Sequence, residues 1–462
     1  MRHLRLISTM GVVMLAIALL CAPAYASLAD ILYEKGQLTK EEWLKAKADE
    51  EKALAPVEKV SEWQKKVSKL PILSDKFNIG LNVLQVQYLQ NEAPVQAAGS
   101  ADNRLFIRRA ELIAWGKVND YFPRYHMLAD FGALSNVTAN VAGGSNNQIL
   151  REAYIDIVPA LSAQPYLDKI RIGQYRIPVG IEGSTSSGLI DFVNRNYITA
   201  TPGTSGGGTA GTTTANVTGT GVGGSLDFIP ERDIYVDFKS KPLEQLELDL
   251  GIMNGNGING LSTVDNNSQK DFFGRARVKP RKDMFFSFGT IAGKSTNLNS
   301  RNGGRGLGNY DRYIADFQIK PEAIPGLWLQ GEFAWGHDAP TASTATGATN
   351  PEAFPARSRG VVRTGWYVYG KYLIQSGWLK DWELLARYEE FDPSQNLSQD
   401  MLYRTTVGIN YYFANMPPRV HAKLMLNYEF RQRGGIGPNT SVTPFDEFGS
   451  DALLLQLHVR WF

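Results

Sequence analysis

The feature that most constrains this chain is an alternation of apolar and polar residues with a period of two, which starts at Phe77 and runs to the C-terminus. Successive side chains of a β-strand point to opposite faces of the sheet, so this alternation gives each strand one apolar and one polar face. In "RVHAKLMLNYEF" the apolar positions are Val420, Ala422, Leu424, Leu426, Tyr428 and Phe430. The pattern predicts sixteen strands, over residues 77–90, 104–118, 121–133, 149–158, 168–177, 232–240, 245–253, 270–280, 283–294, 310–320, 326–337, 361–374, 380–391, 401–413, 418–431 and 450–461.

The connections between these stretches alternate strictly between short and long. The short ones, such as residues 119–120 and 281–282, are tight turns. The long ones are polar and rich in Gly, Asn and Ser, and they cover residues 91–103, 134–148, 178–231, 254–269, 295–309, 338–360, 392–400 and 432–449. A soluble sandwich has no reason to sort its loops in this way, whereas a transmembrane barrel has short periplasmic turns, long outer loops and apolar outer faces. Residues 77–462 are therefore predicted to form an all-β, sixteen-stranded antiparallel transmembrane β-barrel, whose closure also removes unpaired sheet edges.

Aromatic residues and the C-terminus support the same prediction. Aromatic side chains gather at the expected strand ends, as girdles at the two membrane interfaces do; they include Trp115, Tyr121, Trp328, Trp335, Trp366, Trp378, Trp382 and Trp461. The chain ends "LLLQLHVRWF", which resembles the signal by which outer-membrane barrels are recognised for insertion. Its apolar positions are in phase with Trp461 rather than with Phe462.

The N-terminus has the three parts of a secretory signal peptide. Arg2 and Arg5 precede an apolar run over residues 11–21, and a small-x-small motif, "AYA", follows. We therefore expect residues 1–26 to be removed on export. The apolar run is shorter than the about 20 residues that a membrane-spanning helix needs, and the Leu before Cys21 makes a lipoprotein site a poor alternative.

Removal of this leader leaves a neutral chain without cysteine. Cys21 is the only cysteine of the sequence, so disulfides, thiolate catalysis, Cys-ligated metals and covalent haem are excluded within the mature chain. Two of the 48 basic residues lie in the leader, so 46 basic residues face 46 acidic ones, and global charge does not argue for nucleic acid. The four remaining histidines lack metal-ligand spacing and no Ser/His/Asp cluster is readable, so we expect neither an enzyme nor a bound cofactor.

Residues 27–76 have a helical pattern and are predicted to form a periplasmic segment. Thr39 and Glu42 fit a capping box at the start of a helix. An apolar stripe at spacings of three and four follows, made of Val60, Trp63, Val67 and Leu70. The stripe fits local packing, or a short coiled coil between protomers.

The cations expected on the inner wall gather on one strand. In "FFGRARVKP", Arg275, Arg277 and Lys279 share one face, and we name them the cationic row. An anion could step along such a row at small cost. Arg176 and Arg195, at the edges of residues 178–231, are weaker candidates. The same inward faces also carry acids, which could balance the row: Asp130, Asp156, Asp237, Glu247, Asp249, Asp316, Glu332, Glu383 and Glu389.

Several motifs, in the order of the chain, resemble the phosphate-selective porin family of Gram-negative outer membranes. They are "LADILYEKGQLTKEE", "NRLFIRRAELIAWGKV", "REAYIDIVP", "IRIGQYRIPVGIEGSTSSGLIDFVNRN", "ERDIYVDF" and "LGIMNGNG". The resemblance implies a sixteen-stranded barrel, usually a trimer, with the third outer loop, here residues 178–231, folded into the lumen as a constriction. It also implies that basic residues line the pore and attract anions, among them Arg108 and Arg109 of "IRRA".

These two adjacent arginines raise a question of orientation. Arg109 shares a face with Glu111 and is expected to point into the lumen, whereas Arg108 shares a face with Phe106 and Leu112, which should meet lipid. Near the end of a strand a lipid-facing Arg costs only about 0–1 kcal/mol. A β-bulge would instead turn Arg108 inward, and the family precedent favours the bulge.

The function expected from these observations is passive diffusion of small hydrophilic solutes across the bacterial outer membrane, with a preference for phosphate-like anions. The expected partners are outer-membrane lipid and lipopolysaccharide, small anions and two further copies of the chain. A general porin without anion selectivity is one alternative. Another is a barrel that sheathes a multihaem cytochrome in an electron conduit, a role that a wide lumen without an inserted third loop would favour. The polar inward faces argue against a transporter of hydrophobic substrates.

Overall fold

The computed structural model describes residues 39–45, 76–91, 103–132, 149–159, 166–199, 228–229, 231–255, 269–296, 307–338, 361–392, 395, 401–416, 420–433 and 451–461. Sixteen strands lie within them: β1 (Asn78–Asn91), β2 (Asn103–Gly116), β3 (Arg124–Asp130), β4 (Leu150–Ile157), β5 (Lys169–Arg176), β6 (Arg232–Leu243), β7 (Leu246–Met253), β8 (Asp271–Arg281), β9 (Met284–Thr296), β10 (Leu307–Ile319), β11 (Leu327–Asp338), β12 (Val361–Leu373), β13 (Trp382–Asp392), β14 (Leu402–Met416), β15 (Val420–Arg433) and β16 (Ala452–Trp461).

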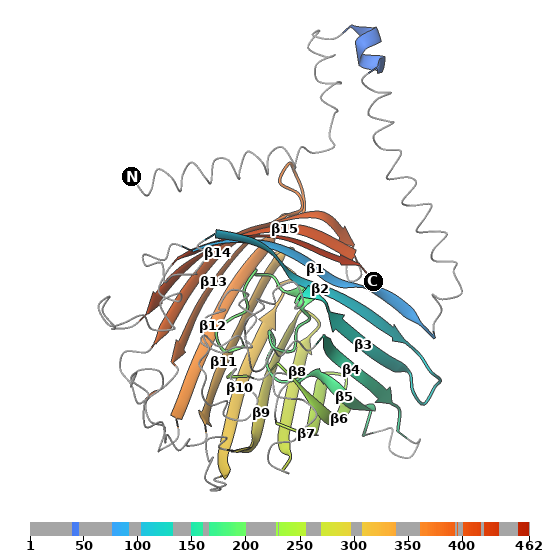
Figure 1. Ribbon diagram of the computed structural model, residues 1–462, viewed down its shortest axis with the longest axis vertical. Helices are drawn as coiled ribbons and strands as arrows, with labels where there is room; N and C mark the ends of the chain where they lie inside the picture. Colours follow the sequence, from blue (N-terminus) through green and yellow to red (C-terminus); the bar gives the residue numbers. More distant parts are fainter. Residues whose placement is uncertain are drawn as a thin grey trace, which may run out of the picture. The chain divides into compact units, whose positions relative to one another are not determined.

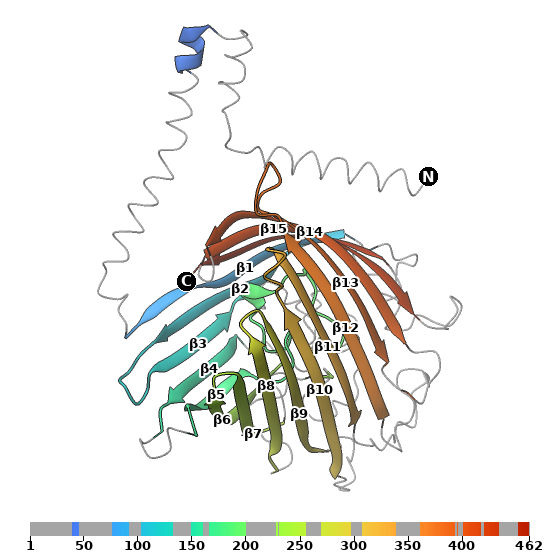
Figure 2. The same cartoon turned by 180° about the vertical axis from the view of Figure 1, so that it is seen from behind.

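These strands form one closed barrel. Each strand pairs antiparallel with the next in the chain, and β16 pairs with β1 (Figures 1 and 2). Closure leaves no sheet edge whose backbone N–H and C=O groups would need another partner. The predicted all-β, sixteen-stranded antiparallel barrel is therefore confirmed, and every strand begins and ends within three residues of its predicted bounds.

The two faces of the wall differ as the period of two requires. Along β13, Leu384, Ala386 and Tyr388 are exposed, while the residues between them, Leu385 and Arg387, are buried. The exposed apolar residues are on the outside of the barrel. The inside carries the polar residues, buried against each other and against a segment of chain that enters the barrel.

The pair of adjacent arginines is resolved by a β-bulge in β2. Gln85 of β1 lies opposite Arg109, but the next residue, Val86, lies opposite Ile107, so Arg108 is an extra residue in the ladder. The bulge reverses the phase of the strand. As a result Ile107 faces outward, and both arginines are buried on the inner side.

The N-terminal segment is described only at one short helix. Glu42 Oε2 accepts a hydrogen bond from the Thr39 N–H at 2.9 Å, and Thr39 Oγ1 accepts one from the Glu42 N–H at 3.3 Å, so the predicted capping box is present. The signal peptide and the apolar stripe at residues 60–70 lie outside the described residues. No described helix is long and apolar enough to cross a membrane.

We predict that deletion of residues 28–70 leaves a closed barrel. Residues 74–462 form one compact unit and residues 1–73 another. Lys76, which the deletion keeps, already contacts the barrel, because its carbonyl oxygen accepts a hydrogen bond from the Tyr125 hydroxyl at 2.8 Å. The deleted protein should still run as a folded, heat-modifiable band on an unheated detergent gel. A longer deletion that removes β1 should abolish that band. Loss of the band with the shorter deletion would show that the helical segment belongs to the fold.

Candidate functional site

A loop segment, residues 178–199, lies inside the barrel, where the green ribbon runs between the walls in Figures 1 and 2. It belongs to the third long connection, between β5 and β6. Its backbone groups cannot pair within a sheet, so they need other partners when they are buried. Polar side chains of the inner wall provide these partners.

On one side the loop segment is bound by β14 and β15. The Val193 N–H donates to Asn427 Oδ1 at 2.7 Å. Lys423 Nζ donates to the Ile190 carbonyl oxygen at 2.8 Å, and Asn410 Nδ2 donates to that of Asp191 at 3.1 Å. These contacts explain why the face of β15 opposite its apolar positions is polar.

Contacts with other strands show that the loop segment crosses the lumen. Glu332 of β11 accepts a hydrogen bond from the Ile181 N–H at 2.7 Å. A ring nitrogen of His458 on β16 lies 3.2 Å from the Gly188 carbonyl oxygen, and Gln85 of β1 donates to the Ser187 carbonyl at 3.4 Å. The loop segment therefore links opposite parts of the wall.

Apolar side chains add to this attachment. Phe192, Tyr197 and Ile198 of the loop segment are almost completely buried in one cluster with wall residues such as Tyr367 and Phe391. Phe228 and Ile229, further along the same connection, belong to the cluster too. Burial of apolar surface contributes roughly 25 cal/mol per Å². The interior of the barrel thus contains a small hydrophobic core that holds the loop segment in place.

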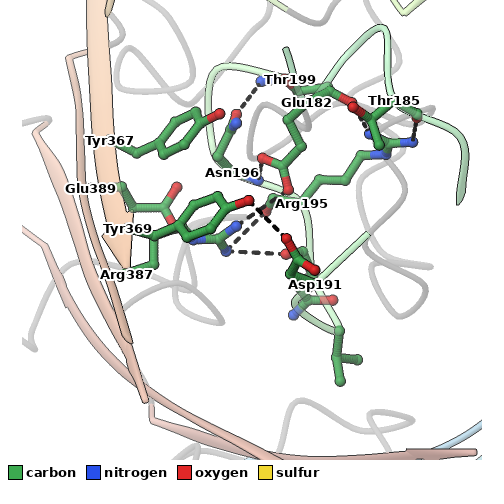
Figure 3. Close-up of polar contacts among 12 residues, drawn as sticks. Glu182, Thr185, Asp191, Arg195, Asn196, Thr199, Tyr367, Tyr369, Arg387 and Glu389 are labelled. Carbon is green, nitrogen blue, oxygen red and sulfur yellow. Dashed lines mark hydrogen bonds and ion pairs between the residues drawn. The ribbon is translucent and has the colours of Figure 1, made fainter. Parts of the chain in front are cut away.

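A buried network of arginines and carboxylates fixes the loop segment to β13 and β14. Figure 3 shows Arg387 and Glu389 of β13 beside Glu182 and Arg195 of the loop segment. Glu389 is at its centre. It accepts a hydrogen bond from Arg404 Nε at 2.7 Å and one from the Tyr197 N–H at 2.6 Å, and it forms an ion pair with Arg387 at 3.0 Å. Arg387 also lies 3.3 Å from Glu182 of the loop segment. Each charge here has an opposite charge beside it, which burial requires.

Two carboxyl groups of the third long connection have shifted pKa values. Burial raises the pKa of Glu182, against the opposing effect of Arg387 and Arg195. Burial acts in the same direction on Glu231, but Arg232 and Arg195 outweigh it and lower the pKa of that group. Glu231 therefore stays ionised beside the arginines, whereas Glu182 takes up a proton more readily than an exposed glutamate does.

The adjacent residues Arg108 and Arg109, which the family resemblance predicts to line the pore, have different partners. Arg108 donates to the Val193 carbonyl oxygen at 2.8 Å, to Asn194 Oδ1 at 3.0 Å and to Gln87 Oε1 at 2.9 Å. Arg109 donates to Gln85 at 2.9 Å and lies 3.5 Å from Glu111. Arg108 thus binds the loop segment, while Arg109 binds the wall.

The three residues of the cationic row pair with two different carboxylates. Arg275 lies 3.2 Å from Asp316 and donates to the Pro178 carbonyl oxygen at 3.2 Å, at the base of the loop segment. Arg277 lies 3.4 Å from Glu247, which also pairs with Lys279. The charge of Arg275 is balanced by one carboxylate, whereas Arg277 and Lys279 share one.

The two candidates at the edges of the loop are also paired. Arg176 forms an ion pair with Glu152. Arg195 lies 3.2 Å from Glu231 and donates to the Thr185 carbonyl oxygen at 2.9 Å, and its side chain is only 2% exposed. The contacts of Arg195 hold the loop segment and leave it little surface for a solute.

One cavity of about 400 Å³, which we call the arginine cavity, brings together cations that are far apart in the sequence. Its lining includes Arg124, Arg176, Arg277 and Arg460, with Glu152 as the one carboxylate among its lining residues. Arg124 and Arg460 were not among the pore-lining residues predicted from the sequence. Both are in phase with inward-facing histidines on their strands, His126 and His458, and that phase is the signal that could have identified them.

A second cavity of about 530 Å³, which we call the aromatic cavity, lies between the loop segment and β10 to β15. Trp328, which we expected in an aromatic girdle, lines this cavity and packs on the inner cluster instead. Thr185, Leu189 and Gln318 line both cavities. The described residues contain no cluster of His, Cys, Asp and Glu that could hold a metal ion.

Comparisons with known proteins agree with this architecture. The family model described as "Phosphate-selective porin O and P" matches residues 77–241 and 320–461. Among solved structures, the chain is similar to OmpF of Salmonella typhi in complex with daunomycin, with 10% identity, a TM-score of 0.50 and coverage of 83% of this chain and 97% of that one. At such identity the similarity shows the fold alone.

Two further solved structures are similar to the chain. One is the outer membrane channel DcaP of Acinetobacter baumannii, with 12% identity, a TM-score of 0.48 and coverage of 83% of this chain and 97% of that one. The other is OmpT of Vibrio cholerae, with 11% identity, a TM-score of 0.46 and coverage of 84% and 97%. No curated protein matches the chain.

Proposed function

The chain belongs to the phosphate-selective porin O and P family, and from this membership we propose that it is an anion-preferring diffusion channel for small hydrophilic solutes. The porin fold and the location in the bacterial outer membrane follow from the family and the closed barrel. The preference for anions is supported by the arginine cavity, where four arginines face one carboxylate.

The preference for anions has to come from local charges, because the mature chain is neutral overall. Between the loop segment and the wall, solvent is limited, so the effective dielectric constant is lower than in bulk water. There a cation acts on a passing ion more strongly than the same cation on an outer loop, where salt screens it. Arg277 and Lys279 leave one positive charge after Glu247 is counted, and Arg460 lines the same cavity as Arg277.

The loop segment supports a channel of limited width. The chain segment and its side chains occupy part of the lumen, and solutes have to pass beside them. The sheath of a cytochrome would need an open lumen, so the position of residues 178–199 does not favour that alternative. We propose that the apolar outer face contacts lipid and lipopolysaccharide, and that the assembly is a homotrimer, as the family resemblance implies.

The test is ion selectivity of the purified protein in planar bilayers. In a gradient of KCl, the reversal potential should show chloride permeating better than potassium at low salt, and the preference should weaken as salt rises. A family member selective for phosphate should also show reduced chloride current when phosphate is added. Equal permeability of the two ions at low salt would indicate a general porin. A preference for potassium would overturn the proposal.

A further inference from the structure

The aromatic cavity has a lining that the passage of inorganic ions does not require. Alongside charged groups it presents Leu189, Phe192, Leu327, Trp328, Tyr369 and Tyr412. Its volume of about 530 Å³ is within the range of roughly 300–1,000 Å³ that small-molecule sites have, and such sites combine apolar walls with a few polar groups. The composition therefore suits an organic solute with a ring.

Two lysines lie against the ring of Trp328 in this cavity. Lys371 Nζ is 4.5 Å from the ring centroid and Lys320 Nζ is 3.7 Å from it. The charge of Lys371 is more than balanced, since it forms ion pairs with two carboxylates, those of Asp191 and Glu383. Lys320 has no ion pair with a carboxylate among the described residues. The lining holds three lysines and three carboxylates, and of the two lysines beside Trp328 only Lys320 has no described carboxylate within ion-pair distance.

The position of Lys320 makes it available to a solute. It follows the last residue of β10, in the turn to β11, and its side chain is exposed. Burial on one side, together with the positive charge of Lys371, lowers the pKa of Lys320. An anionic group placed beside it would relieve this repulsion.

From these observations we propose that the aromatic cavity is a binding site for small ring-bearing organic anions, with the ring at Trp328 and the anionic group at Lys320. The proposal rests on the proposed anion channel and names the class of its solutes. The arginine cavity is adjacent, because Thr185, Leu189 and Gln318 line both cavities. A solute that leaves the aromatic cavity therefore meets further cations.

Phenyl phosphate and inorganic phosphate are suitable probes, because they carry the same anionic group with and without a ring. We would measure block of the KCl current through the full-length protein at a pH where both probes are dianions. Phenyl phosphate should block at about tenfold lower concentration, since aromatic contact and ring burial together contribute about 1.4 kcal/mol. Benzyl alcohol, which has the ring without the charge, should not block.

Matched variants separate the ring from the charge. Trp328→Leu should bring the blocking concentrations of the two phosphates together, whereas Trp335→Leu, on the same strand but in the outward phase, should keep them apart. Lys320→Gln should weaken block by phenyl phosphate, and Lys282→Gln, in another short turn, should not. If Trp328→Leu fails to fold, Lys320→Gln still decides the question.

The outcomes also distinguish this binding-site proposal from the proposed anion channel on which it rests. Equal block by the two phosphates in the unmodified protein, which still prefers chloride, would overturn the ring site and leave the anion channel intact. A protein that prefers potassium and is blocked by neither probe would overturn both. Preferential block by phenyl phosphate that survives Trp328→Leu and Lys320→Gln would place the site elsewhere and overturn the assignment.

Discussion

Glu389→Gln should release the loop segment from the wall and lower the stability of the protein. Glu389 pairs with Arg387 and Arg404 and accepts the Tyr197 N–H. The substitution removes the negative charge between two buried arginines, and breaking a buried ion pair on one side costs about 3–5 kcal/mol. Single-channel conductance should rise, because the loop segment no longer narrows the lumen. The temperature at which the folded band disappears on gels should fall.

The neighbouring residue gives the control. Glu390 is on the outward face of the same strand, where it accepts hydrogen bonds from Trp366 Nε1 at 3.1 Å and from the Tyr388 hydroxyl at 2.7 Å. Glu390→Gln changes the same charge outside the network and should alter neither conductance nor unfolding temperature by much. If Glu389→Gln keeps the conductance of the unmodified channel, the arginine and carboxylate network does not hold the constriction.

The second large effect concerns selectivity. Arg277→Gln together with Arg460→Gln should lower the permeability ratio of chloride to potassium about tenfold at low salt, which corresponds to about 1.4 kcal/mol. Both residues line the arginine cavity, and together they contribute two of its four arginines. The effect should fade at high salt as the remaining charges are screened. The reversal potential in a KCl gradient measures the ratio directly.

Two further variants make the sign of the effect testable. Arg281→Gln removes a cation from the same strand, but Arg281 is exposed, pairs with Asp283 and does not line the arginine cavity, so the selectivity should not change. Glu247→Gln removes the carboxylate shared by Arg277 and Lys279, so the preference for chloride should increase. An unchanged reversal potential in the double variant would mean that the arginine cavity does not set selectivity.

The fold could be predicted because its signals are local in the sequence. The period of two is visible within each strand, and the alternation of connection lengths is visible between neighbouring strands. The inward turn of Arg108 is different, because residue pattern alone placed it on the apolar face. The bulge depends on the pairing with Gln85 and Val86 of β1, which no single strand reveals.

The candidate site could be predicted only in part, because its charges are paired across distant segments. The alternation in β8 correctly put Arg275 and Arg277 on one face. It could not show that Asp316 of β10 balances Arg275, or that Arg275 also binds the base of the loop segment. Arg460 was not predicted, because the signal that identifies β16 is its row of apolar residues, and Arg460 lies on the opposite face of that strand.

The contacts of the loop segment also constrain the order in which the protein assembles. Val193 and Asn427 are 234 residues apart in the chain, and Asn194 and Glu429 are 235 apart. Contacts between residues so far apart in the sequence are slow to form. The pairing of β16 with β1 then seals the barrel around the segment. We therefore expect the segment to lie inside the wall by the time β1 and β16 pair, because the closed wall surrounds it.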